Sequence, residues 1–126
     1  MEFIVNPLGK DTIYDQLIFQ VKLAIANGTL QAGDILPSVR GLAKSLSVST
    51  ISVQRAYGEL QKEGIIESAE GKGNFVSAGV SKASLKDALI MAVEDEARRV
   101  IHIAKQNGIS RDELTDLIQL LWEDFS

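Results

Sequence analysis

Few residues of this 126-residue sequence have the types and spacing that catalysis requires. His102 is the only histidine, and the chain has no cysteine with which it could share a metal ion. Asp95, Glu96 and Arg99 lie near it and give at most a weak exposed cluster. The serines lack a nucleophile elbow, and the Gly-Lys-Gly stretch at 71–73 is too short to cradle a phosphate group. We therefore expect a protein that is not an enzyme and needs no cofactor or metal.

Other polar side chains are suited to binding. Arg40 lies near the start of a predicted helix, where the helix dipole gives a cation no benefit, and this favours a phosphate contact over a structural role. Ser49 precedes another predicted helix, as a structural N-cap or as a phosphate contact. Gln54 is either a ligand-reading side chain or part of a solvated face, and Lys72 is either a solvated loop tip or a binding residue.

The elements that position these residues follow from helical periodicity. Apolar residues spaced three and four apart predict helices over about 12–27, 38–46 and 49–63, and residues 1–11 are expected to form a loosely held arm. Two short amphipathic helices across a three- to four-residue turn are typical of a helix-turn-helix. The β-prone runs 65–68 and 74–77 flank a glycine-containing tip and predict a hairpin. Together these elements predict a winged helix over about residues 12–78, with Tyr57 in its core.

The C-terminal part of the sequence has a different pattern. A helical stripe runs from residue 81 to residue 107, and Ser110 with Glu113 matches a capping box that opens a last helix. About 48 residues are too few for a stable separate core, so we expect this helical hairpin to bury its apolar stripe against a second copy. The polar side of the last helix is acidic, which disfavours an anionic membrane surface. The predicted dimer contacts are Leu89, Val100, Leu114, Leu117, Ile118, Leu121, Trp122 and Phe125.

Composition and charge restrict the class of protein. The sequence is 45% hydrophobic and 24% charged, which is typical of a folded globular protein. It has no apolar run long enough to span a membrane and no signal-peptide pattern, so a cytoplasmic location is expected. The net charge of −4 counts against nucleic-acid binding. Residues 1–78 carry a net charge of −1 and residues 79–126 a net charge of −3, so the acidity leans toward the C-terminal part.

The pattern from Ile13 to Val76 resembles the GntR family of transcriptional regulators. The resemblance rests on motifs that occur in order and at the family's spacing. They are Ile13-Tyr14-Asp15-Gln16-Leu17, Ile25-Ala26-Asn27-Gly28-Thr29-Leu30, Gly33, Leu36-Pro37-Ser38-Val39-Arg40, Leu42-Ala43, Leu46, Val48-Ser49, Val53, Ala56-Tyr57, Leu60, Gly64-Ile65-Ile66 and Gly71-Lys72-Gly73-Asn74-Phe75-Val76. The short two-helix tail is similar to that of the YtrA-type subfamily, in which such tails are associated with dimerisation.

The resemblance implies roles for particular residues. Arg40 would meet the DNA backbone or bases, and the wing tip would approach the minor groove. The start of the recognition helix would read the major groove. Thr50 departs from the family pattern, which often has an arginine there, and a threonine gives weaker and less discriminating base contacts. The implied DNA-binding residues are Arg40, Ser49, Thr50, Ser52, Gln54, Arg55, Gly71, Lys72 and Gly73.

The sequence therefore predicts a mostly α protein with a winged helix-turn-helix domain at 1–78 and a two-helix dimerisation region at 79–126. The resemblance implies a repressor that binds double-stranded DNA as a homodimer, with two recognition helices about 34 Å apart on a palindromic operator. The alternative is a winged-helix protein-interaction module that does not bind DNA, for which the negative net charge is the best support. The sequence identifies no small-molecule effector, operator or regulated gene.

Overall fold

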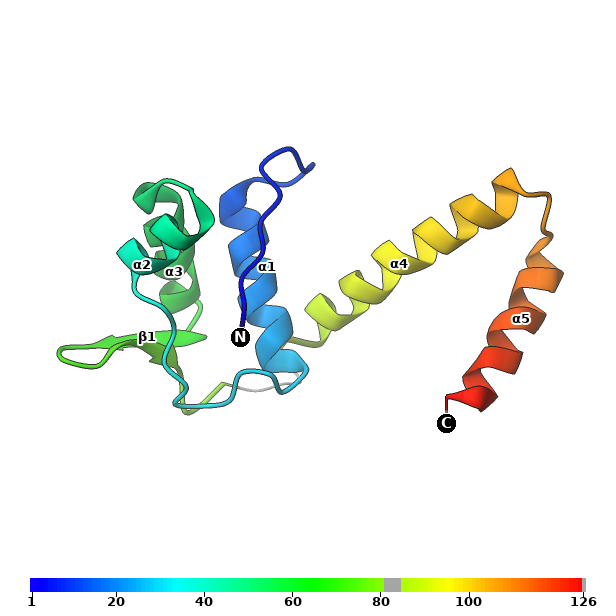
Figure 1. Ribbon diagram of the computed structural model, residues 1–126. Helices are drawn as coiled ribbons and strands as arrows, with labels where there is room; N and C mark the ends of the chain where they lie inside the picture. The colour runs from blue at the N-terminus through cyan, green and yellow to red at the C-terminus, as the bar shows by residue number, and fades with distance from the viewer. Residues whose placement is uncertain (81–84, 126) are drawn as a thin grey trace. The chain divides into compact units, whose positions relative to one another are not determined.

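The computed structural model describes residues 1–80 and 85–125, and the fold over these residues is mostly helical (Figure 1). The elements are α1 (Ile13–Ala26), α2 (Val39–Leu46), α3 (Thr50–Lys62), β1 (Ile66–Ala69), β2 (Gly73–Val76), α4 (Lys86–Gln106) and α5 (Arg111–Asp124). The three helices and the hairpin predicted for the winged helix are present, so the predicted fold class is confirmed. The chain divides into two compact units, Met1–Leu89 and Ile90–Ser126. The first unit thus includes the start of α4, whereas the sequence placed the boundary after residue 78.

Each helix of the winged helix begins at a residue whose side chain caps it. The side chains of Thr12, Ser38 and Ser49 accept hydrogen bonds from backbone N–H groups in the first turns of α1, α2 and α3. These bonds satisfy donors that the helix itself cannot pair. The capping role predicted for Ser38 is therefore confirmed, and Ser49 also acts as an N-cap.

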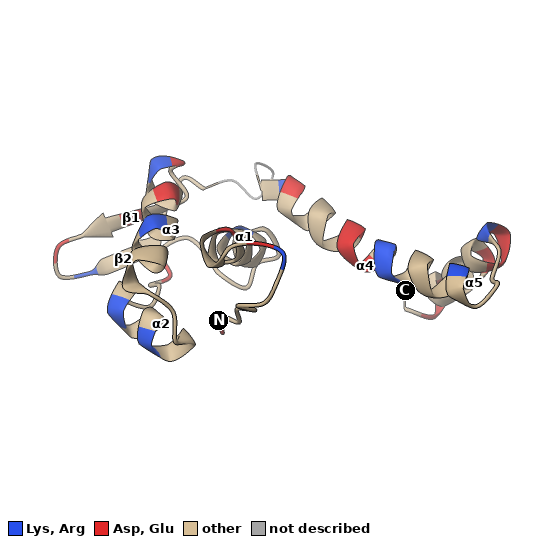
Figure 2. Ribbon diagram, turned by 90° about the horizontal axis from the view of Figure 1, so that it is seen from above, with Lys and Arg blue, Asp and Glu red and all other residues tan. Residues whose placement is uncertain are grey.

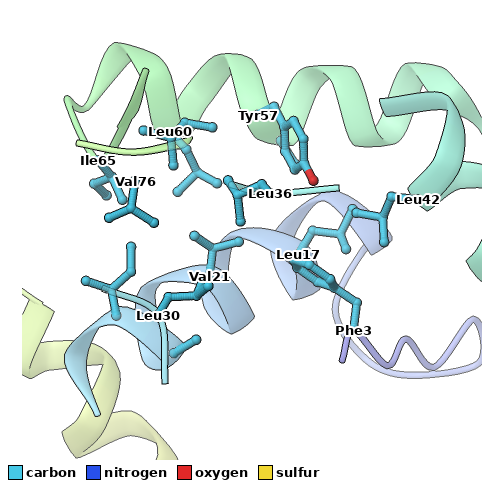
Figure 3. Close-up of a cluster of buried hydrophobic side chains, with 14 of the residues drawn as sticks. Phe3, Leu17, Val21, Leu30, Leu36, Leu42, Tyr57, Leu60, Ile65 and Val76 are labelled. Carbon is cyan, nitrogen blue, oxygen red and sulfur yellow. The ribbon is translucent and has the colours of Figure 1, made fainter. Parts of the chain in front are cut away.

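The core of the first unit lies between α1, α2, α3 and the sheet (Figure 3). Leu17 and Val21 of α1 and Val53 and Leu60 of α3 have no exposed surface. Leu17 and Val21 are four residues apart and Val53 and Leu60 are seven apart, so each pair lies on one helix face, as the sequence predicted. Tyr57 is 2% exposed and belongs to the same core, which confirms its predicted position.

The hairpin is antiparallel, with Ile66 paired to Val76 and Ala69 paired to Gly73. A third segment borders it, because the N–H groups of Gly33 and Leu36 donate to the carbonyls of Val76 and Asn74 at 2.8 Å. β2 is therefore hydrogen-bonded on both sides, and the loop before α2 is fixed to the wing.

The N-terminal arm is attached to the domain, contrary to the prediction. Phe3 is 7% exposed and belongs to the core cluster. The side chains of Gln16 and Gln20 exchange hydrogen bonds with the backbone of Asn6 and Ile4. The prediction was wrong because it considered turn residues in the arm and not the glutamines of α1 that hold it.

The second unit consists of the rest of α4 and α5. The sequence predicted the first of these helices from residue 81, and residues 81–84 lie outside the described part. The capping box is confirmed, since Glu113 N–H donates to Ser110 Oγ and Ser110 N–H donates to Glu113 Oε1, both at 3.1 Å. None of the described residues of α5 is buried. Within residues 1–80 and 85–125, no helix is both long enough and apolar enough to cross a membrane.

Leu89 has a different environment from the one predicted. It packs against the core of the first unit, next to Leu85, which is 5% exposed and belongs to that core. The helical stripe of α4 therefore begins as part of the winged-helix unit. The sequence could not show this, because a stripe of leucines does not specify which surface covers it.

Candidate nucleic-acid interface

The turn between α2 and α3 is short and has a defined conformation. Ser47 ends α2 in a left-handed conformation with φ of 56°, and the Val48 N–H donates to Ala43 O at 3.0 Å. Such a left-handed residue after a helix lets the chain turn sharply. Because Ser49 then caps α3, the two helices are joined within three residues, as a helix-turn-helix requires.

The start of α2 is fixed to α3 by a buried phenol. The Tyr57 hydroxyl donates to Pro37 O at 2.8 Å, immediately before the Ser38 cap. Burial raises the pKa of Tyr57 far above its ordinary value, so the hydroxyl stays protonated and remains a donor. Arg40 lies in the first turn of this fixed helix and is exposed. The Arg40 side chain is therefore exposed on a helix whose start is fixed by hydrogen bonds.

The residues at the start of α3 divide into capping and free side chains. Ser49 Oγ accepts from the Ser52 N–H at 3.0 Å and lies 3.2 Å from the Ser52 hydroxyl. Thr50 and Gln54 are exposed, whereas Ser52 is half-buried. Thr50 and Gln54 are therefore accessible to a ligand. Ser49 and Ser52 mainly stabilise the N-terminal end of α3 through their hydrogen bonds.

Arg55 is exposed and lies toward α1. Its Cζ atom is 5.3 Å from the centroid of the Tyr14 ring, which is a cation–π distance. The positive charge is thus positioned by α1 instead of extending freely from α3. Sequence reasoning missed this contact, because it joins residues that are 41 positions apart.

The wing presents a tight tip. Gly71 and Gly73 both have φ of 78°, a conformation that other residues rarely adopt. Lys72 Nζ lies 4.0 Å from the centroid of the Phe75 ring, which holds the ammonium over the hairpin. At an exposed site such a contact contributes only about 0.5–1 kcal/mol, so a phosphate can compete for the lysine. Gln61 of α3 donates to Asn74 Oδ1 at 2.8 Å and fixes the wing to the recognition helix.

The distribution of charge resolves the objection raised by the net charge. No acidic residue occurs between Asp34 and Glu59, and this stretch contains Arg40, Lys44 and Arg55. Figure 2 shows α2 with basic and no acidic positions. Lys44 is exposed on α2 and was not among the predicted site residues. The absence of acids from one continuous stretch would have identified it.

Comparisons with known proteins agree with this geometry. The sequence profile of the bacterial regulatory proteins of the gntR family matches residues 13–76, which contain α1, α2, α3 and the wing. The HTH-type transcriptional repressor YtrA of Bacillus subtilis is 32% identical over 95% of this chain and 92% of its own length. The match to this repressor therefore includes the tail helices as well as the winged helix.

Two solved structures are similar to the chain. YtrA from Sulfolobus acidocaldarius, a GntR-family transcription factor, has a TM-score of 0.56 and 31% identity, and the match covers 95% of this chain and 96% of that one. The DNA-binding domain of AraR in complex with operator ORX1 has a TM-score of 0.51 and 25% identity, over 59% of this chain and 92% of that one. The operator-bound relative thus matches a part of this chain about as long as the winged helix.

Proposed function

The chain belongs to the GntR family of bacterial transcriptional regulators, and from this premise we propose that it is a repressor that binds a palindromic operator as a homodimer. It is a DNA-binding regulator and not an enzyme. The observation that carries the proposal is that the family match at 13–76 includes α2 and the first part of α3, where residues 35–58 contain basic side chains and no acidic residue. Repression is supported by the similarity to the repressor YtrA along nearly the whole chain.

The proposed roles of the individual side chains follow from their positions in the site. Arg40 and Lys44 on α2 contact phosphates, because both are exposed and neither forms an ion pair with another described residue. Thr50 and Gln54 face the major groove, where a glutamine amide matches adenine. On binding, the Lys72 ammonium leaves the Phe75 ring and contacts a DNA phosphate near the wing. Phosphate contacts set the register and base contacts set the sequence preference.

We also propose that the second unit joins two copies of the chain. Leu117, Ile118 and Leu121 are between 43% and 50% exposed, and Trp122 and Phe125 are 76% and 89% exposed. Ile118, Leu121, Trp122 and Phe125 line an apolar hollow at the C-terminal end of α5. A second copy is the occupant that fits, because a twofold axis covers the same stripe on both chains and brings two winged helices to one duplex. Binding to chromosomal DNA implies a cytoplasmic location.

The experiment is fluorescence anisotropy of the full chain with the duplex upstream of its own gene and with a shuffled duplex, across a salt series. The native duplex is expected to bind more tightly, and the affinity is expected to fall steeply with salt. Arg40→Ala should weaken binding to both duplexes and reduce the salt slope by about one unit. Arg98→Ala is the matched control, because Arg98 is 74% exposed on α4 and pairs with Glu94.

Two results would contradict the proposal. Failure to bind either duplex at low salt would show that the surface of α2 and α3 serves another partner. An unchanged salt slope for Arg40→Ala, with the control also unchanged, would remove Arg40 from the phosphate contacts.

A further inference from the structure

Ile51 is an apolar side chain that α3 does not use for packing. It is 66% exposed, whereas Val53 and Leu60 of the same helix have no exposed surface. Ile51 is the second residue of α3 and lies next to the Ser49 cap. An isoleucine at this position contributes nothing to the core, and as a β-branched residue it is a poorer helix former than alanine. Its presence therefore has no explanation in the folding of the domain.

The face of α3 that carries Ile51 is open. Gln54, Arg55 and Gly58 follow it at spacings of three, four and seven residues, so all lie on this face. The three are exposed, and a Cβ atom added at Gly58 would meet no atom within 4 Å. The face therefore presents an apolar group at its N-terminal end, an amide one turn later and bare backbone beyond it, while the Arg55 guanidinium lies over the Tyr14 ring of α1.

This arrangement matches one feature of the DNA major groove. The C5 methyl group of thymine is the apolar group that the four bases present there, while adenine presents an acceptor and a donor that a glutamine amide can pair. Ile51 is stiff about χ1, so little rotamer freedom is lost when it contacts a methyl group. We propose that Ile51 is a specificity-determining residue that contacts a thymine methyl group in each half-site of the operator.

This inference rests on the proposed function, since it requires the start of α3 to enter the major groove. Isolated exposed apolar residues are common on protein surfaces and need not have a role. The test must therefore distinguish a thymine contact from a residue that is merely exposed, and both of these from a protein that does not bind DNA in this way.

The experiment replaces thymines of the footprinted operator by deoxyuridine, one symmetric pair at a time. This replacement removes the C5 methyl group and leaves the base pairing unchanged. For the wild-type chain, one or two positions are expected to lose affinity by about fourfold for each half-site, the factor that corresponds to one buried methyl group. The other positions should have little effect.

Ile51→Ala is then titrated against the same set of duplexes. It should bind the thymine operator about tenfold more weakly and should no longer respond to deoxyuridine at the sensitive positions. Ile4→Ala is the matched control, because Ile4 is 72% exposed on the N-terminal arm. The control should retain both the affinity and the deoxyuridine response of the wild-type chain. Thermal unfolding of Ile51→Ala should be unchanged or slightly improved, since no packing is lost.

Each outcome has a separate meaning. Sensitivity to deoxyuridine that persists in Ile51→Ala would overturn the assignment, because another residue would then contact the methyl group. Insensitivity of the wild-type chain at every position, with specific binding intact, would also overturn it and leave the proposed function standing. Loss of all preference between native and shuffled duplexes in the wild-type chain would instead contradict the proposed function.

Discussion

The two units of this molecule have similar proportions of apolar residues but bury them to different extents. In Met1–Leu89 the apolar faces of α1, α2 and α3 meet each other and the hairpin, and side chains such as Leu17 and Leu60 are completely buried. In Ile90–Ser126 the stripe of α5 has the same helical spacing, yet none of its described residues is buried. The first unit buries its own hydrophobic surface, whereas the apolar stripe of α5 is exposed in the single chain. Substitutions can therefore be directed at the core of the first unit or at the exposed stripe of α5 separately.

The two units also differ in how their basic residues are paired with acidic ones. The basic residues Arg40 and Lys44 on α2 have no acidic neighbours along the chain between Asp34 and Glu59. On α4, by contrast, Arg98 lies within 4 Å of Glu94 and Asp95, and Arg99 pairs with Glu96 at 2.6 Å. Arg40 and Lys44 form no ion pair with another described residue, whereas Arg98 and Arg99 of the second unit are both paired with carboxylates. The net charge of −4 for the whole chain does not show this difference between α2 and α4.

The largest change in the free energy of unfolding is expected from leucine truncations, which test whether the two units are stabilised in different ways. Leu60→Ala empties a fully buried site and should lower the free energy of unfolding by about 3 kcal/mol at every protein concentration. Leu117→Ala removes the same atoms from a side chain that is 46% exposed in the single chain. Its cost should be smaller and should fall as the protein is diluted, because association stabilises by mass action. Thermal melts over a concentration series provide the measurement.

If the two variants respond identically to dilution, the contrast between the units is wrong. A concentration-independent cost for Leu117→Ala would mean that the stripe is covered within one chain.

The next effect concerns the link between association and operator binding. Leu121→Asp places a carboxylate in the apolar stripe of α5 and should convert the protein to monomer, with a loss of operator affinity of about 100-fold. Gln119→Asp adds the same charge on the polar side of the same helix and should leave both properties intact. Sedimentation and anisotropy measured on the same samples check this. A monomeric Leu121→Asp variant that binds as tightly as the wild type would break the link.

A smaller effect tests two glycines within the first unit. Gly58 is an exposed position inside α3 with open space around it, so Gly58→Ala should raise the stability by up to about 1 kcal/mol. At Gly41 a Cβ atom would lie 2.8 Å from the Ser38 hydroxyl that caps α2. Gly41→Ala should therefore gain less or lose stability, because the cap must move. Chemical denaturation gives both values, and equal gains would show that the Ser38 cap tolerates the added methyl group.

The smallest effect concerns the capping box at the start of α5. Hydrogen bonds with the backbone and side chain of Ser110 lower the pKa of Glu113. A lowered pKa means that the ionised carboxylate stabilises the folded helix above its ordinary pKa, and this contribution is lost as the pH falls through the lowered value. The Ser110 amide resonance, followed by NMR, should titrate with a midpoint below about 4.3, the ordinary value for glutamate. A midpoint at or above that value would contradict the hydrogen bonds.

Much of the fold could be predicted because its signals are local. Ser38 and Ser110 mark helix starts, Gly64 with φ of 76° follows α3, and the spacing of Val53 and Leu60 identifies the buried face. The family motifs then identified the winged helix and the region of the site.

The features that the sequence did not reveal are contacts between distant residues. The attachment of Phe3 to the core, the packing of Leu89 against the first unit and the position of Arg55 over Tyr14 all depend on tertiary structure. Periodicity shows that a side chain is buried and does not show which surface buries it. Ile51 was missed for another reason, because it differs from its surroundings only when exposure is considered along with residue type. Lys44 could have been found from the sequence, since it lies in the stretch without acidic residues.

We propose that the second unit, whose α5 stripe is exposed in the single chain, pairs two winged-helix units on one palindromic operator. Sedimentation velocity of the full chain with its fluorescently labelled operator tests this most directly. The free protein is expected to be a dimer. The complex is expected to contain two chains per duplex and to form without a populated one-chain intermediate. A single chain bound to the intact operator with full affinity would contradict it.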